Sequence, residues 1–154
     1  MAPVYPLHHP HLMLITCQSG FESLLTQEVQ AGGGIATAQG PGWVIAADAF
    51  AAESAFAHLM LRDTTELRGE SVNALVKQLA EYFLEGIKGE RIDAAWPCVL
   101  QGPMEMEGIN RRIHAVEKAL REYLKKRLSR VAKLAVADLP RGVQEARGLF
   151  VWFT

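Results

Sequence analysis

In the N-terminal third of the chain, short apolar runs alternate with segments whose apolar residues recur at helical spacing. Leu12 to Cys17 is apolar but too short for a helix, so it predicts a buried strand. From Gly20 to Gln30 apolar residues recur at helical spacing, which predicts an amphipathic helix with Ser19 and Glu22 as a capping box. Residues 35–47 predict a β-hairpin around a Gly-Pro-Gly turn.

An alanine-rich stretch follows the hairpin. Asp48 to Ala57 predicts a second helix capped by Asp48, and His58 to Leu67 predicts a strand. The order strand, helix, strand, strand, helix, strand is the ferredoxin-like βαββαβ arrangement, an antiparallel sheet with two helices on one face. We expect this domain to occupy residues 12–68, after a flexible leader over residues 1–11 that holds three prolines and no periodicity.

Residues 69–154 predict a second unit that mixes helices and strands. Ile92 to Gln101 contains a strand, in which Pro97 is expected at a bulge or an edge. Before it, a helix starts at Ser71, and its predicted buried face consists of Val72, Leu75, Val76, Leu79, Tyr82, Phe83 and Ile87.

The C-terminal part predicts one long helix and a final strand. Ile109 to Leu134 has the apolar stripe of a single amphipathic helix, and Leu149 to Phe153 is strongly β-prone. The chain stops on Trp152 and Phe153, large apolar side chains that need covering. We therefore expect a segment of a longer protein, the alternative being a docked edge strand.

Charge is divided unevenly between the two parts of the chain. Residues 1–109 hold five Lys/Arg and thirteen Asp/Glu, whereas residues 110–154 hold eleven Lys/Arg and four Asp/Glu. Ten of the basic residues lie between Arg111 and Arg141, mostly on the predicted long helix. A concentrated basic face suits a polyanion, because each phosphate contact releases condensed counterions. The alternative is a solvated helix face.

The candidate RNA-binding residues are the basic side chains of that helix and one histidine. From the first to the last of them the helix would span roughly 33 Å, long enough to follow a nucleic-acid backbone without reading its sequence. They are Arg111, Arg112, His114, Lys118, Arg121, Lys125, Lys126, Arg130 and Lys133.

Other chemistry has little support in the sequence. Cys17 and Cys98 are the only cysteines, and two isolated thiols indicate small buried residues rather than a disulfide or a metal site. No catalytic Ser-His-Asp or Cys-His arrangement can be assigned, and no metal or cofactor site is predicted. No apolar run approaches the ~20 residues of a membrane span, and no Lys or Arg precedes Arg62, so we expect a cytoplasmic protein without a membrane partner.

The first strand and helix also carry a family resemblance. A strand ending in Cys17 leads through Gly20, Phe21 and Glu22 into a helix with the trailing Glu28. This opening resembles the ribosomal RNA large-subunit methyltransferase M family, bacterial 2′-O-ribose methyltransferases. The resemblance implies an α+β chain in which the ferredoxin-like domain, 12–68, precedes a THUMP-like RNA-binding domain, 69–154.

The resemblance sets expectations for function as well. The family's S-adenosylmethionine-binding half, with its Lys-Asp-Lys-Glu catalytic residues, has no counterpart in this sequence, so no catalytic residue is transferred. The chain is then the substrate-recognition part of a ribosomal RNA (23S-type) methyltransferase. S-adenosylmethionine would be bound by a C-terminal methyltransferase domain of the same protein. The alternative function is a non-enzymatic ferredoxin-like module that binds a small ligand or another protein.

Overall fold

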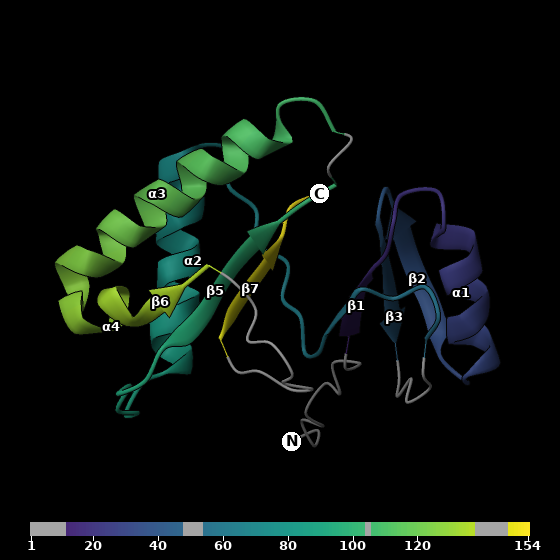
Figure 1. Ribbon diagram of the computed structural model, residues 1–154, viewed down its shortest axis with the longest axis horizontal. Coiled ribbons are helices and arrows are strands. Elements are labelled where there is room, and N and C mark those ends of the chain that lie inside the picture. The colour runs from purple at the N-terminus through teal and green to yellow at the C-terminus, as the bar shows by residue number, and fades with distance from the viewer. Residues whose placement is uncertain (1–11, 48–53, 104–105, 138–147) are drawn as a thin grey trace, which may run out of the picture. The chain divides into compact units, whose positions relative to one another are not determined.

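The computed structural model describes residues 12–47, 54–103, 106–137 and 148–154 (Figure 1). The predicted leader over 1–11 therefore lies outside the described residues. The chain divides into two compact units, unit 1 from Met1 to Thr65 and unit 2 from Glu66 to Thr154. Unit 1 holds an antiparallel sheet and unit 2 a parallel sheet, so the chain is of mixed α and β structure.

Unit 1 is a sheet with one described helix packed on it. Its elements are β1 (Leu12–Thr16), α1 (Glu22–Ala31), β2 (Ile35–Gly40), β3 (Trp43–Ala47) and β4 (Leu59–Leu61). The strands lie in the order β2-β3-β1-β4, and all neighbouring pairs are antiparallel. Leu25 and Val29 of α1 are fully buried in the same cluster as Ile15 and Val44 of the two central strands. The predicted first strand, first helix and hairpin are confirmed.

The predicted capping box at the start of α1 is wrong. The helix begins one residue after Phe21, and no side chain caps it. Instead, the Glu22 carboxylate accepts the Gly20 N–H at 2.9 Å and, across the hairpin turn, the Gly42 N–H at 2.7 Å. Glu22 thus joins the start of the helix to the β2–β3 turn.

The segment before β4 also differs from its prediction. Residues 48–53 lie outside the described part, but residues 54–57 are not helical. The Ser54 hydroxyl accepts the N–H groups of Phe56 and Ala57 and so closes a turn. The strand expected over 58–67 is limited to β4, because Asp63 has a φ of 52° and redirects the backbone.

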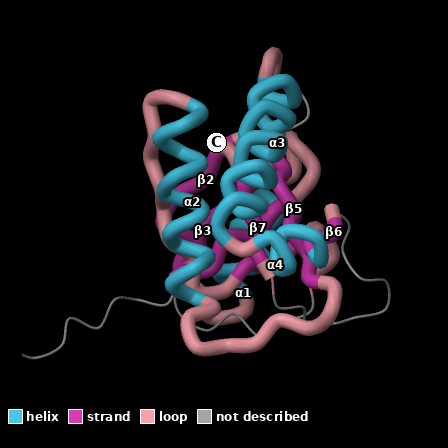
Figure 2. Tube along the Cα trace, turned by 90° about the vertical axis from the view of Figure 1, so that its left-hand side faces the viewer, coloured by secondary structure: helices cyan, strands magenta, loops and turns pink. Residues whose placement is uncertain are grey.

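Unit 2 places two long helices against a three-stranded sheet (Figure 2). Its elements are α2 (Val72–Gly86), β5 (Trp96–Gln101), α3 (Ile109–Arg127), α4 (Ser129–Leu134), β6 (Ala135–Val136) and β7 (Leu149–Trp152). The strands lie in the order β6-β5-β7, and both neighbouring pairs are parallel. The predicted strands within 92–101 and 149–153 are confirmed.

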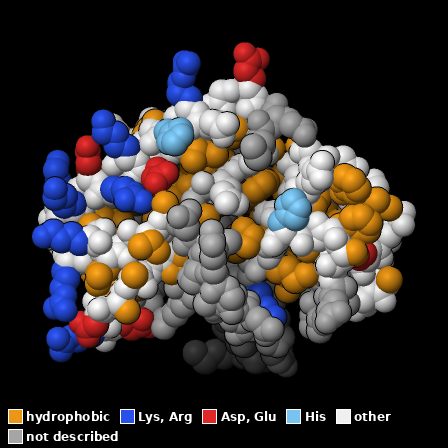
Figure 3. Space-filling view, in the orientation of Figure 1, with side chains coloured by type: hydrophobic (Ala, Val, Ile, Leu, Met, Phe, Trp, Pro, Cys, Tyr) orange, Lys and Arg blue, Asp and Glu red, His pale blue; other side chains and the backbone are white. Residues whose placement is uncertain are grey.

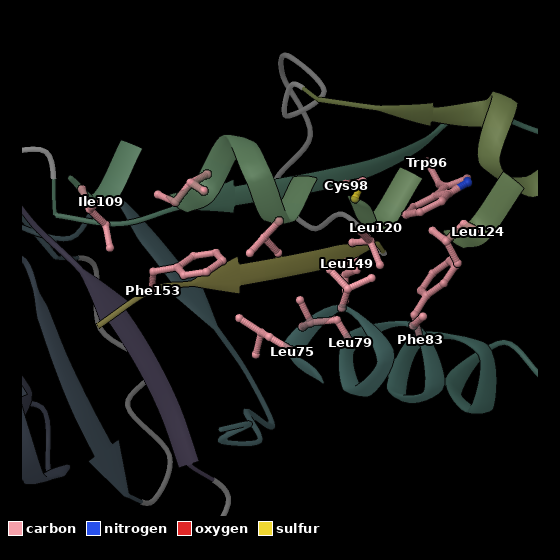
Figure 4. Packing of buried hydrophobic residues seen from close by; sticks show 14 residues of the cluster. Leu75, Leu79, Phe83, Trp96, Cys98, Ile109, Leu120, Leu124, Leu149 and Phe153 are labelled. Atoms are coloured by element: carbon pink, nitrogen blue, oxygen red, sulfur yellow. The ribbon is translucent and has the colours of Figure 1, made fainter. Parts of the chain in front are cut away.

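The core of unit 2 joins α2 and α3 to β5 and β7 (Figure 4). Phe83 of α2 stacks on Trp96 of β5 with ring centroids 4.4 Å apart. The predicted start of this helix at Ser71 is confirmed, and the Ser71 hydroxyl caps α2 by accepting the Ala74 N–H at 3.1 Å. Tyr82, in contrast, is not buried but 46% exposed, because it lies at the margin of the apolar stripe of α2.

The prediction that Pro97 lies at a bulge or an edge is wrong. It is the second residue of β5, the central strand. A proline is tolerated there because it lies near the beginning of the strand, where β6 contributes only two residues. Gly148, just before β7, allows the backbones of β5 and β7 to come close together. A Cβ on Gly148 would lie 2.2 Å from the Pro97 carbonyl oxygen.

Within the described residues, no helix combines the length and the apolar character needed to cross a membrane.

Candidate nucleic-acid interface

The apolar positions of α3 fix which side of this helix faces the solvent. The helix starts after Gly108, whose φ of 77° favours glycine, and ends with Lys125, Lys126 and Arg127, which complement the negative end of the helix dipole. Its buried face consists of Ile109, Ile113, Val116, Leu120 and Leu124.

Five of the predicted residues form one stripe on the far side of α3. Because an α-helix turns by about 100° per residue, they fall within an arc of about 80° that extends along about 21 Å of the axis. All five are exposed. This set, called the α3 stripe below, consists of Arg111, His114, Lys118, Arg121 and Lys125. Figure 3 shows the Lys and Arg side chains of unit 2 following α3 along the left-hand edge.

The charge of the α3 stripe is only partly balanced by carboxylates. Arg121 forms an ion pair with Glu117 one turn before it, at 3.3 Å. Arg111, Lys118 and Lys125 form no ion pair with a carboxylate among the described residues. These three side chains are therefore the cations of the stripe that are most accessible to an anion.

The other predicted α3 residues, Arg112 and Lys126, are exposed but lie on the opposite flank of the helix from the stripe. The Arg112 guanidinium donates to the Gly69 carbonyl oxygen at 3.5 Å. The structure therefore places both outside the α3 stripe.

The single long helix predicted over 109–134 is wrong. Leu128 has φ −140° and ψ 80°, so the backbone breaks there and α4 begins as a separate helix. Val131 and Leu134 then pack against the core of unit 2. Trp96 donates its indole N–H to the Val131 carbonyl oxygen at 2.9 Å. Tertiary packing outweighs the helical pattern here.

The break at Leu128 separates two predicted RNA-binding residues from α3. Arg130 and Lys133 lie on α4, and Arg130 forms an ion pair with Asp93, in the segment between α2 and β5, at 3.1 Å. A straight basic face from Arg111 to Lys133 does not exist.

Sequence reasoning missed two arginines at this corner. Arg127 lies over the ring of Tyr123, 5.3 Å from its centroid, and donates to its hydroxyl at 3.0 Å. Arg91 binds the same carboxylate as Arg130, that of Asp93. The Lys-Lys-Arg run at the end of α3 is a sequence signal that could have indicated Arg127. No spacing in the sequence could have indicated that Arg91 lies beside α4.

The five residues that carry the family resemblance have structural roles in unit 1. Gly20 has a φ of 99°, and Phe21 stacks on Phe56 with ring centroids 5.7 Å apart. Glu28 accepts hydrogen bonds from the Ser54 hydroxyl and from the Ala55 N–H, and the pKa of Glu28 is lowered mainly by that hydroxyl. The remaining two are Glu22, described above, and the buried Cys17.

Both cysteines are buried and unpaired, as the sequence indicates. Burial raises the pKa of the Cys98 thiol to about 11, with Glu117 adding to the rise and Arg121 opposing it. The pKa of Cys17 is also raised, first by burial and then by the nearby Glu22 carboxylate. Thiols in this state are poor nucleophiles and poor metal ligands. In the described part of the chain no three His, Cys, Asp or Glu residues could together hold a metal ion.

Comparisons with protein-family models, with curated proteins and with solved structures give no match to this chain. Its assignment to the methyltransferase family is therefore a hypothesis that rests on the residues themselves.

Proposed function

We propose that the chain is the RNA-recognition part of an S-adenosylmethionine-dependent ribosomal RNA 2′-O-ribose methyltransferase. The α3 stripe holds the phosphates of a 23S-type RNA, and a C-terminal domain of the same protein binds the cofactor and transfers the methyl group. RNA binding and methyl transfer take place in the cytoplasm.

The observation that carries the proposal is the α3 stripe. Its cationic side chains are exposed, lie on one side of one straight helix and are backed by a buried apolar face. A rigid row of this kind can bind successive phosphates without selecting a base sequence, which is what a positioning module requires.

The topology of unit 1 supports the ferredoxin-like part of the proposal. An antiparallel sheet in the order β2-β3-β1-β4 is the strand order that a βαββαβ chain produces when its first and third strands are central. The described residues supply the first helix of that pattern. Unit 2 is proposed as the THUMP-like domain, because it joins helices to a small parallel sheet and carries the basic helix.

The test uses charge reversal at the two unpaired lysines of the α3 stripe. We expect Lys118→Glu with Lys125→Glu to weaken binding to a structured 23S-type RNA fragment, measured by anisotropy, and to reduce the slope of log K against log salt by about 1.4–1.8. The matched control is Arg68→Glu with Lys77→Glu, which changes the net charge equally at exposed positions outside α3.

The two variants separate a local effect from a general one. Equal losses in both would indicate that only net charge matters and would remove the α3 stripe from the proposal. Absence of salt-dependent RNA affinity in the unmodified chain would favour the alternative, a non-enzymatic ligand- or protein-binding module.

A further inference from the structure

A groove opens where α3 gives way to α4, beside the segment that joins α2 to β5. It has a volume of about 610 Å³, within the range of small-molecule sites. The α3 stripe is not part of it. Its described lining includes four basic side chains, Lys88, Arg91, Arg127 and Arg130, and two acidic ones, Glu90 and Asp93. The lining therefore has a net charge of +2.

Asp93 positions two of the arginines at this groove. Its carboxylate contacts Nε of Arg91 and Nη2 of Arg130, each at 3.1 Å. The two guanidinium groups are held beside one carboxylate although their side chains are 80% and 70% exposed. Ion pairs this exposed contribute little to stability. In the structure they bring two guanidinium groups to the same carboxylate at the groove.

The contacts leave most of the arginine donors available. A guanidinium has five N–H donors in a planar fork, and Asp93 engages only one nitrogen of each arginine. Arg127 likewise uses one nitrogen on the Tyr123 hydroxyl. Forks of this kind bind phosphate oxygens in pairs, in a geometry that lysine cannot reproduce.

The groove also has an apolar side. Ile87, Ile92 and Leu128 line it, and Leu128 is 43% exposed because it lies at the break between the helices. A ligand that fits the groove therefore combines a compact anionic group with a less polar body. A phosphate monoester carries a charge of about −1.5 to −2 at neutral pH, which complements the lining.

We propose that this groove binds the phosphate monoester of a nucleotide, either a free mononucleotide or the phosphorylated 5′ end of an RNA strand. The phosphate lies among Arg91, Arg127 and Arg130, and the nucleoside covers the aliphatic side. The site and its ligand differ from those of the α3 stripe, where extended cations face the singly charged diesters of an RNA backbone.

The structure supplies a reporter for this groove. Trp96 donates its indole N–H to the carbonyl oxygen of Val131, a residue of the groove lining. Its indole signal in a ¹⁵N-labelled sample of the full chain, assigned with Trp96→Phe, responds to ligands there. Trp43 of unit 1 is the internal control. We expect 5′-AMP to shift the Trp96 signal saturably and adenosine to leave it unchanged.

Matched variants assign the effect to the arginines. We expect Arg91→Gln with Arg130→Gln to weaken 5′-AMP binding by at least about tenfold, since two charged phosphate contacts are lost. Lys118→Gln with Lys125→Gln, in the α3 stripe, leaves it unchanged. Retained Trp43 and Trp96 signals show that each variant is folded.

Oligonucleotides distinguish the two sources of the phosphate. Tighter binding of 5′-phosphorylated than of 5′-hydroxyl hexauridylate, lost in the arginine variant but kept in the lysine variant, supports an RNA end. Binding of 5′-AMP with equal affinity for both oligonucleotides supports a free mononucleotide. No response to 5′-AMP and equal oligonucleotide affinities overturn the proposal, as does a response to a glutamate-rich peptide alone. None of these outcomes depends on whether the α3 stripe binds RNA.

Discussion

The Glu22 carboxylate offers the sharpest test of how unit 1 is held together. It accepts the N–H groups of Gly20 and Gly42 and so fastens the start of α1 to the β2–β3 turn. These hydrogen bonds, that from Gly42 first, lower the pKa of Glu22, and its desolvation opposes them. Glu22→Gln removes the charge but retains the size and one acceptor oxygen.

The expected loss follows from the number and kind of these contacts. A hydrogen bond to a charged group contributes about 1.5–3 kcal/mol where solvent is excluded. Glu22 is only half-buried, and screening reduces the expected destabilisation of unit 1 to about 1 kcal/mol. With a urea dependence of about 1–3 kcal/mol per molar, the unfolding midpoint falls by roughly 0.3–1 M.

The pH dependence identifies the charge as the cause. Since the pKa is lower in the folded state than in the unfolded state, the stabilisation is complete above about pH 5 and is lost as the pH falls through the folded value. The free energy of unfolding of the Glu22→Gln variant should therefore be lower than that of the unmodified protein at pH 7, and the two values should converge in acid.

The assay follows unit 1 alone. The Trp43 indole signal in urea reports its unfolding, and amide exchange at Gly42 reports the hydrogen bond directly. Ser23→Ala, at an exposed position next to Glu22, is the control for substitution in the first helical turn. An unchanged urea midpoint with unchanged Gly42 exchange at pH 7 would refute the reasoning, and a loss independent of pH would show that packing rather than charge is responsible.

Two further predictions concern unit 2. Gly148→Ala should destabilise it by about 1–3 kcal/mol, because the new Cβ meets the Pro97 carbonyl oxygen. Urea unfolding followed by the Trp96 signal measures this loss. Gly86→Ala is the control, because a Cβ there meets no atom within 4 Å, and equal effects in the two variants would contradict the prediction. Cys98, whose pKa is raised to about 11 by burial, should react with a disulfide reagent at pH 8 at least about 100-fold more slowly in the folded than in the urea-unfolded protein; rates within tenfold would show that burial does not protect the thiol.

The sequence predicted those elements that form and pack through residues close to one another along the chain. The first strand, α1, the hairpin and the Ser71 cap depend on neighbouring residues, and all were predictable. The roles of Glu22 and Glu28 were not, because their partners lie at Gly42 and Ser54, twenty or more residues away. A carboxylate in a first helical turn has the same sequence signature whether it caps that helix or reaches a distant turn.

The candidate site was predictable to the extent that it follows helical periodicity. The α3 stripe follows directly from the spacing of its residues, whereas the pairing of Arg91 and Arg130 on Asp93 requires the fold. Arg130 was therefore assigned correctly as an exposed cation but placed on the wrong helix. A periodic pattern gives the direction of a side chain only as long as the helix continues.

The packing of α4 shows what the core of unit 2 gains when the backbone breaks at Leu128 and α4 then ends at Leu134. Within an uninterrupted helix the Val131 carbonyl oxygen would accept the N–H of residue 135, but α4 ends at Leu134 and Ala135 enters β6 with extended backbone angles. That carbonyl instead accepts the indole N–H of Trp96, which is 6% exposed and needs a partner. The core of unit 2 thus gains a satisfied tryptophan and two packed aliphatic residues, Val131 and Leu134. The break at Leu128 divides one basic run of the sequence into a linear row on α3 and a convergent group at the α3–α4 corner. The two arrangements suit different anions, an extended backbone and a compact phosphate, and variants in one should leave binding at the other unchanged.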